Sequence, residues 1–559
     1  MLFWQDARAL VEQGQDDKYL KFLPYVIGFI ILVVFVFASR PFWMTNDDVS
    51  MAMITDGTGI AASPSPRLVL TNIAWGYLIR WLPGVGGIQS YTLATYAALT
   101  IAYATTLYAL FRSEANALFA SAILLIVFAP ALVYPQYTLV AGYLAFAGIV
   151  LLCIPPGKQS IPSVYLAGAL VVLSGLVRAD ETALVALIAI PVCIGYWSAA
   201  AGSKIRRHWL IVLAATAVVF VAFQFLDLET FGSGGWDEYS KTYLTRTEFT
   251  DFSLPWYYQL HARLMFGSGY TIDDFIIFKK WFYIDTHVFS VEKLAPFSNN
   301  VSWYGRAEAN LKLFQQSLAP FIDPQILVLS GAVIFVLLFH QRRWYFLASI
   351  IVVAAVMFIL LLMGRPGVTR IYIPVFAALA IMGIMQPTGS RPWIHACAAL
   401  LAVSGTFWML NGIHRLNSWE SQASAHVQTV TCHMPHEPLV VIWGSDYPYS
   451  LEYPPFTPQS EVCPLKIYSI GEFSLAPYAL EQLHDATGGK DLVPALLAGE
   501  PLDFIASPVD LQLLRDYFLR HYSVQLSTQQ VMQDQLFTLY RVEKQPAAAR
   551  LAAMARRGR

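Results

Sequence analysis

Eleven long apolar runs constrain this chain more than any other feature. A helix needs about 20 largely apolar residues to cross the hydrocarbon core of a bilayer. Helices also satisfy their own backbone polar groups in lipid. Only 13% of the residues are charged, against about 25% in soluble domains. We therefore expect a mainly α, polytopic membrane protein with spans near 21–39, 91–111, 115–133, 138–154, 162–177, 182–199, 209–226, 323–340, 345–363, 371–386 and 392–411.

Positive charge predicts how these spans are oriented. Lys and Arg accumulate in short cytoplasmic loops. Residues 67–82 are apolar but are interrupted by Asn72 and Arg80, so they could span the membrane or lie in its interface. The interfacial or re-entrant reading places both Arg206-Arg207 and Arg342-Arg343 on the side of the N-terminus. We therefore predict a cytoplasmic N-terminus in a bacterial inner membrane. Residues 1–20 read as a cytoplasmic leader before a retained first helix.

Three segments should then face outward. They are two loops within the transmembrane module of residues 21–411, at 40–90 and 227–321, and the chain after about Asn411. Residues 439–443, 502–505 and 535–542 read as strands, and 509–521 have helical spacing. We expect a small extracytoplasmic α/β domain over about 430–545, followed by a basic tail at 546–559.

The first outer loop contains adjacent carboxylates at Asp47 and Asp48. Such a pair could bind a divalent cation, or one member could act as a general base. Whether a metal binds here is left open, and no other cofactor is indicated. The alternative is a solvated acid pair in which Asp48 caps a helix beginning at Val49.

Two outward turns carry further charge close to the hydrocarbon. The first contains Arg178, Asp180 and Glu181, and the second contains Arg365 and Arg370. Charges at this depth usually face protein or a cavity, and arginine binds phosphate through forked, charge-assisted contacts. The alternatives are an Arg–Asp pair that marks the interface and arginines that contact anionic lipid headgroups.

The second outer loop combines aromatic residues with His261, Asp273 and Asp274. This mixture suits a cover over a site that contains sugar and phosphate, and equally an aromatic belt at the membrane surface. Cys432 and Cys463 both fall in the outward C-terminal segment, where disulfides persist. We predict that these two cysteines pair.

Several classes of protein are excluded or unsupported. A net charge of −1 gives no indication of a nucleic-acid partner. No histidine or cysteine cluster has zinc spacing. The sequence contains no P-loop, no dinucleotide fingerprint and no Gly-x-Ser-x-Gly elbow.

The layout resembles the GT-C superfamily of polytopic glycosyltransferases over roughly the first 410 residues. The resemblance rests on two short stretches: Asn46-Asp47-Asp48-Val49-Ser50-Met51 followed by Gly57, Gly59, Pro64 and Asn72, and Asp273-Asp274-Phe275 followed by Trp281-Phe282 and Val288-Phe289-Ser290. It implies an inverting transferase of the cell envelope that is embedded in membrane lipid. Its donor would be a polyprenyl-phosphate sugar, and its acceptor a glycan or a lipid. By position, Asp47 or Asp48 would be the base, Arg365 and Arg370 would hold the donor phosphate, and Arg178 would assist.

Two other functions remain open. One is a transporter or flippase of a lipid-linked or anionic substrate, although the sequence shows no internal repeat. The other is a non-catalytic assembly protein of an envelope polysaccharide. For the transferase we expect Asp180, Glu181, His261, Asp273 and Asp274 to contribute to substrate binding.

Overall fold

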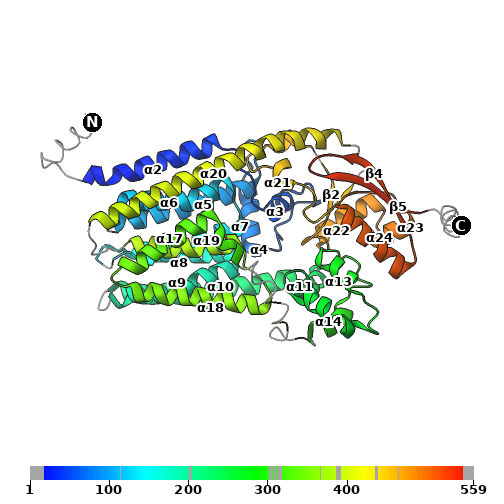
Figure 1. Ribbon diagram of the computed structural model, residues 1–559, viewed down its shortest axis with the longest axis horizontal. Helices are drawn as coiled ribbons and strands as arrows, with labels where there is room; N and C mark the ends of the chain where they lie inside the picture. Colours follow the sequence, from blue (N-terminus) through cyan, green and yellow to red (C-terminus); the bar gives the residue numbers. More distant parts are fainter. Residues whose placement is uncertain are drawn as a thin grey trace.

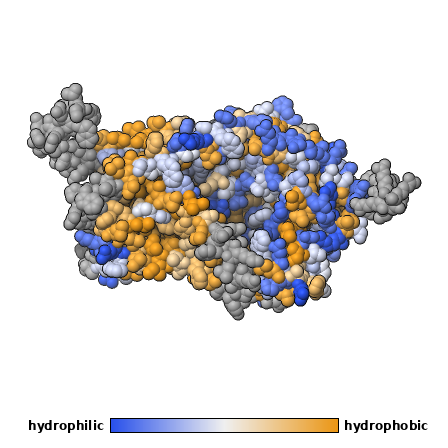
Figure 2. Space-filling model, viewed as in Figure 1, coloured by the Kyte–Doolittle hydropathy of each residue, from blue (hydrophilic) through white to orange (hydrophobic). Residues whose placement is uncertain are grey.

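The computed structural model describes residues 18–113, 115–155, 157–199, 204–299, 301, 306, 310, 318–365, 367–385, 392–434, 439–463 and 465–545. The predicted leader up to residue 17 and the basic tail from 546 lie outside these residues. A bundle of apolar helices forms one end of the molecule, and a polar α/β end forms the other (Figure 1). The surface follows this division, because the bundle is mostly hydrophobic and the opposite end mostly hydrophilic (Figure 2).

A helix occupies each of the eleven ranges predicted from apolar runs. They are α2 (Lys18–Ala38), α5 (Ser90–Arg112), α6 (Ala117–Val133), α7 (Tyr137–Leu152), α8 (Ile161–Val177), α9 (Ala179–Ala199), α10 (Lys204–Phe231), α17 (Pro324–Phe339), α18 (Arg343–Met363), α19 (Thr369–Ile384) and α20 (Pro392–His433). Of the described helices, four are long and apolar enough to cross a membrane: 90–112, 179–198, 205–231 and 343–363. The exact number of spans stays a prediction.

Helix α7 is the centre of the bundle. It is apolar around its whole circumference, which is typical of a helix buried on all sides, and residues 137–151 are all buried. It packs against α5, α8, α9 and α19. Gly142 lets α19 come close, because a Cβ at this position would lie 2.4 Å from the ring of Pro374. The N-terminal end of α7 is thereby held where the bundle meets the α/β end.

The ambiguous stretch 67–82 contains no helix long enough to cross a membrane. It contains α4 (Ile73–Trp81), whose nine residues cover only about 14 Å of a core about 30 Å thick. Gly76 fits closely against the preceding loop, since a Cβ there would lie 1.8 Å from the carbonyl oxygen of Pro66. At the far end of the bundle, Arg112 donates to the carbonyl of Lys158 and Arg342 donates to the carbonyl of Gly195. Which end faces the cytoplasm stays a prediction.

The C-terminal segment forms a five-stranded sheet in the order β2-β1-β3-β5-β4. The strands are β1 (Val440–Trp443), β2 (Ile467–Ile470), β3 (Leu502–Ile505), β4 (Leu526–Gln533) and β5 (Thr538–Lys544). The first three are parallel, and the last two pair antiparallel. The intervening helices are α21 (Tyr449–Glu452), α22 (Pro477–Thr487), α23 (Leu492–Ala498) and α24 (Pro508–Tyr522). Sequence patterns missed β2 and β4.

The sheet is covered on both faces by segments from elsewhere in the chain. Side chains alternate between the faces of a strand. Accordingly, Val440 and Ile442 join the core of the bundle, whereas Val441 and Trp443 join a second core. That second core includes the second outer loop, which forms α11 (Trp236–Thr250), α12 (Leu254–Leu260), α13 (Ile272–Lys279) and α14 (Val291–Asn299). The outer loop and the sheet therefore form one folded unit.

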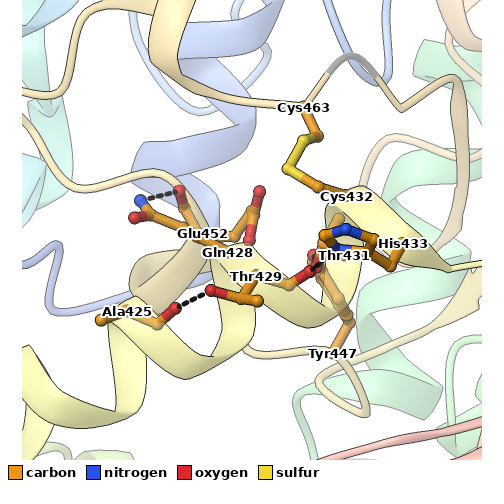
Figure 3. The surroundings of a disulfide bond; sticks show 9 residues. All are labelled: Ala425, Gln428, Thr429, Thr431, Cys432, His433, Tyr447, Glu452 and Cys463. Atoms are coloured by element: carbon orange, nitrogen blue, oxygen red, sulfur yellow. Dashed lines mark hydrogen bonds between the residues drawn. A yellow bond between two sulfur atoms is a disulfide. The ribbon is translucent and has the colours of Figure 1, made fainter.

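Helix α20 extends far beyond its predicted span. Its 42 residues run without interruption into the α/β end, where Cys432 forms the predicted disulfide with Cys463. The two Cα atoms lie 5.4 Å apart, within the usual range for a disulfide. Beside the disulfide, Gln428 donates to the carbonyl of Glu452 at 3.1 Å, and the hydroxyls of Thr431 and Tyr447 share a hydrogen bond (Figure 3). The last turns of α20 are thus part of the α/β end.

Candidate functional site

The two cavities of interest lie where the bundle meets the α/β end. The first, of about 410 Å³, we call the junction cavity. Seven parts of the chain contribute to its lining: the start of α3 (Asn46–Asp56), the start of α7, the two charged turns, the second outer loop, and the loops after β1 and β2. Ligands of open parallel sheets bind outside the carboxyl ends of the strands, and this cavity lies there.

Asp47 is the acid of the predicted pair that reaches the junction cavity. Thr45 is the N-cap of α3, so Asp47 lies in the first helical turn, where the helix dipole favours negative charge. It makes no hydrogen bond to any other described residue. Burial raises the pKa of the Asp47 carboxyl, and the positive charges of Arg370 and Arg178 oppose that rise.

Asp48 turns away from the junction cavity and is fully buried. Its Oδ1 accepts hydrogen bonds from the Tyr91 hydroxyl and the Tyr137 backbone N–H, both at 2.9 Å, and its Oδ2 accepts from Thr45 at 2.5 Å. Burial raises the pKa of Asp48 to about 7, even though these hydrogen bonds favour the ionised form. Asp48 therefore ties α3 to α5 and α7. It is not the helix cap that the sequence allowed.

This arrangement bears on the cation that the acid pair could hold. Both oxygens of Asp48 already accept protein hydrogen bonds, so the carboxylates of Asp47 and Asp48 are not oriented toward one shared cation. Across the part of the chain that the structure describes, no group of three or more His, Cys, Asp or Glu residues has metal-site geometry. The residues present do not form a shared metal site at Asp47 and Asp48.

The predicted arginines Arg178, Arg365 and Arg370 all line the junction cavity. Arg178 donates to the Tyr137 hydroxyl at 2.7 Å. Arg365 pairs with Asp251 at 3.1 Å. No carboxylate among the described residues pairs with Arg178 or Arg370. Two of the three guanidinium groups therefore keep their charge available to a ligand.

Of the three charged residues in the turn between α8 and α9, only one lines the junction cavity. Arg178 faces the cavity, Asp180 is exposed and does not line it, and Glu181 is buried beneath the turn. The Oε1 atom of Glu181 has no hydrogen-bond partner among the described residues. Neither acid lines the junction cavity, and their role in substrate binding stays a prediction.

Three other predicted binding residues are held elsewhere. Asp274 is buried, and its Oδ1 accepts from Arg520 at 2.6 Å and lies 2.9 Å from Nε2 of His521. Asp273 pairs with Arg520 at 3.2 Å. His261 stacks on Tyr257 and bonds to its carbonyl oxygen. Because these side chains tie α13 to α24 or stay within their own loop, the structure does not bring them to the site.

Several cavity residues were not recognised from the sequence. The loop after β2 supplies Glu472, which pairs at 2.7 Å with the buried Arg246. Burial raises the pKa of Glu472, and the nearby Arg246 opposes the rise. The loop after β1 supplies Asp446, whose Oδ2 accepts from the backbone of Ser507 at 2.6 Å. Loops that follow parallel strands could have indicated both acids, had the strand order been known.

The second outer loop supplies Lys280 and Trp281 to the cavity wall. Lys280 pairs with Asp510 at 2.6 Å, and its carbonyl accepts from the Trp443 indole at 2.7 Å. Trp281 has a φ of 72°, in the left-handed region that non-glycine residues rarely adopt. Such strain persists where the surrounding structure enforces it and is concentrated at functional sites.

Comparisons with known proteins give a weak structural likeness. No family model matches the chain, and no curated protein matches it. The structure of ArnT from Cupriavidus metallidurans in the apo state is similar over 92% of this chain and 97% of that chain, with a TM-score of 0.40 and 13% identity. The structure of that ArnT bound to undecaprenyl phosphate covers 94% and 98%, with a TM-score of 0.38 and 13% identity. Agreement at this level does not establish a shared fold.

Proposed function

We propose that this protein is a membrane glycosyltransferase. It moves a sugar from a polyprenyl-phosphate carrier to a hydroxyl of an envelope glycan or lipid on the outer face of the membrane. The observation that carries the proposal is the junction cavity, where Asp47 faces the same space as Arg178 and Arg370. These residues come from three distant segments, so their convergence is a property of the fold.

The charges in the cavity match the needs of this reaction. As the bond between sugar and phosphate breaks, negative charge develops on the departing phosphate, and guanidinium groups held in place stabilise it. Arg370 and Arg178 are suited to this role because no described carboxylate pairs with them. Arg365 is a secondary contact, since Asp251 already engages it.

The acid in the cavity suits the acceptor side of the reaction. A general base works best when its pKa approaches the working pH. Burial raises the pKa of Asp47 in that direction. Asp48 holds the first turn of α3 in place through Tyr91 and Tyr137, so we assign the base role to Asp47 and a positioning role to Asp48.

The position of the cavity suits a lipid-linked donor. It lies at the end of the apolar bundle, beside the N-terminal ends of α7 and α19. A polyprenyl carrier can reach this level by lateral diffusion while its phosphate stays at the polar surface. The substrate site of a transporter typically lies near the middle of the membrane, whereas Asp47, Arg178 and Arg370 meet at one end of the bundle.

The test replaces Asp47 with Asn in cells whose own copy of the gene is deleted, and compares the cell-surface glycans. Loss of a general base typically lowers the rate by about 10²–10⁴-fold. Arg370→Gln should raise the KM for the donor as well as lower kcat. Asp273→Asn is the matched control, because it removes a carboxylate outside the cavity. Wild-type glycans in an Asp47→Asn strain with normal protein levels would refute the proposal.

Orientation has its own test. Reporter fusions after residues 205 and 343 should report the cytoplasm, and a fusion near residue 430 should report the opposite side. The basis is the cluster of basic residues at the far end of the bundle. A cytoplasmic signal at 430 would place the junction cavity on the wrong face for an envelope acceptor.

A further inference from the structure

A second cavity of about 430 Å³ lies apart from the junction cavity. We call it the neutral cleft. One wall is the loop of residues 57–62 that follows α3, together with the N-cap of α5. The other wall consists of one side of α22 and parts of the disulfide-bonded segment, namely residues 453, 454, 457, 459, 462, 463, 465 and 466. The function proposed above makes no use of this cleft.

The lining of the neutral cleft combines small apolar side chains with uncharged hydrogen-bonding groups. The polar groups are the amides of Gln89, Gln459 and Gln482 and the hydroxyls of Thr58 and Thr457. Each amide has two donor hydrogens and an acceptor oxygen, and each uses one of these groups in a hydrogen bond within the protein. The remaining groups match a ligand that presents hydroxyls. One base, Lys466, and one acid, Asp485, also line it and are exposed. Opposite single charges give no preference for an anionic or cationic ligand.

Direct hydrogen bonds hold the two walls in place. The carbonyl of Gly59 accepts from the Ile467 backbone N–H at 2.9 Å and from Gln482 at 3.1 Å. Gln459 bonds to Asp56 at 2.8 Å. Gly59 has a φ of 57°, and a Cβ there would lie 2.4 Å from the sulfur of Met53. The cleft is therefore built before a ligand arrives, which reduces the entropy lost on binding.

Two elements span the gap between the neutral cleft and the junction cavity. Helix α3 has Asp47 at one end and Gly57 at the other, which corresponds to about 15 Å at 1.5 Å per residue. Strand β2 is flanked by Lys466, in the cleft, and by Gly471, in the junction cavity, and these five steps correspond to about 16 Å at 3.3 Å per residue. Two independent paths thus give the same separation.

From this geometry we infer that the neutral cleft binds the uncharged carbohydrate part of the acceptor, about 15 Å from the hydroxyl that reacts. This inference rests on the proposed function, and it specifies the acceptor as a glycan several sugars long. One end of the chain would meet Asp47, while the amides and hydroxyls of the cleft hold sugar hydroxyls further along. The cleft would then determine which glycan is extended.

The experiment measures binding and does not require turnover. The purified full-length protein is titrated with fluorescently labelled neutral oligosaccharides of three to eight units, released by mild acid from the host's surface polysaccharide. Thr58→Trp is the blocking variant, because Thr58 is exposed in the cleft wall. Ser63→Trp is its matched control, since Ser63 is exposed on the same loop but does not line the cleft.

We expect Thr58→Trp to raise the Kd for the oligosaccharides by about tenfold or more and Ser63→Trp to leave it unchanged. Thr58→Trp should still transfer sugar to a short acceptor that cannot reach the cleft. Equal binding by wild type and Thr58→Trp would overturn the inference, as would the absence of any binding by a wild-type protein that transfers sugar. If Thr58→Trp loses oligosaccharide binding as expected but neither wild type nor any variant transfers sugar, the cleft is supported as a carbohydrate-binding site and the proposed function is refuted.

Discussion

Replacement of Asp48 by alanine or by asparagine separates two effects of this buried carboxyl on stability: the hydrogen bonds that it accepts and the proton that it binds. Alanine removes the acceptor of both the Tyr91 hydroxyl and the Tyr137 backbone N–H. A buried donor left without a partner costs about 1–3 kcal/mol, so the loss of two should lower the free energy of unfolding by about 2–6 kcal/mol. Asparagine keeps an acceptor oxygen for both donors, and its amide can donate to Thr45.

The same two variants report the protonation of Asp48. Its pKa is raised to about 7 in the folded protein, against about 3.9 for an unperturbed Asp. The folded state therefore holds a proton that the unfolded state releases, and the free energy of unfolding falls as pH rises from about 4 to 7. Each pH unit within this window is worth about 1.4 kcal/mol, so wild type should lose about 2–3 kcal/mol between pH 5 and pH 8 through this group.

The assay is reversible unfolding in detergent micelles at pH 5 and pH 8. Because neither variant can titrate at position 48, both should gain about 2–3 kcal/mol relative to wild type on going to pH 8. The offset of about 2–6 kcal/mol between them should stay constant. A difference between wild type and Asp48→Asn that is the same at both pH values would refute the buried, protonated carboxyl. An alanine variant as stable as the asparagine variant would refute the hydrogen-bond argument.

Two further predictions concern stability alone. Cys432→Ser should lower the free energy of unfolding by up to about 4 kcal/mol in the chain-entropy model, since the disulfide closes a loop of 31 residues. Reductant should destabilise wild type by the same amount and leave the variant unchanged, and any further loss of stability in the variant would contradict this. Gly76→Ala should cost about 1–3 kcal/mol, because its Cβ would overlap the carbonyl of Pro66. Gly331→Ala is the control, as nothing lies within 4 Å of its Cβ position, and equal thermal unfolding of the two variants would contradict the clash.

The helical part of the fold could be predicted because its signal is local. An apolar run of helical length identifies a span without knowledge of its neighbours, and each predicted range contains a helix. Strand β2 could not be found in this way, since Ile467–Ile470 is only four residues long. Helix α3 was equally hard to predict, because its 11 residues combine buried Met and Ile with two acids.

The residues of the candidate site also divide into those that a local sequence pattern reveals and those that only the tertiary fold reveals. Arg178, Arg365 and Arg370 stand out because charge beside an apolar run is conspicuous in any sequence. Asp274 stands out equally, yet its partner Arg520 lies 246 residues away, and no local pattern distinguishes an acid used for folding from one used for chemistry. Glu472 illustrates the reverse case, because its ion-pair partner Arg246 and its cavity neighbours Asp47 and Arg178 come from distant segments that only the tertiary fold brings together.

Helix α20 gives the molecule a mechanical property. Its 42 residues correspond to a length of about 63 Å. One end of the helix packs among the apolar helices, and the disulfide links the other end to the α/β part of the molecule. The helix is also bonded along its length, through Thr406 to α6 and through Ser424 to α21. One unbroken helix therefore fixes the distance between the apolar bundle and the sheet.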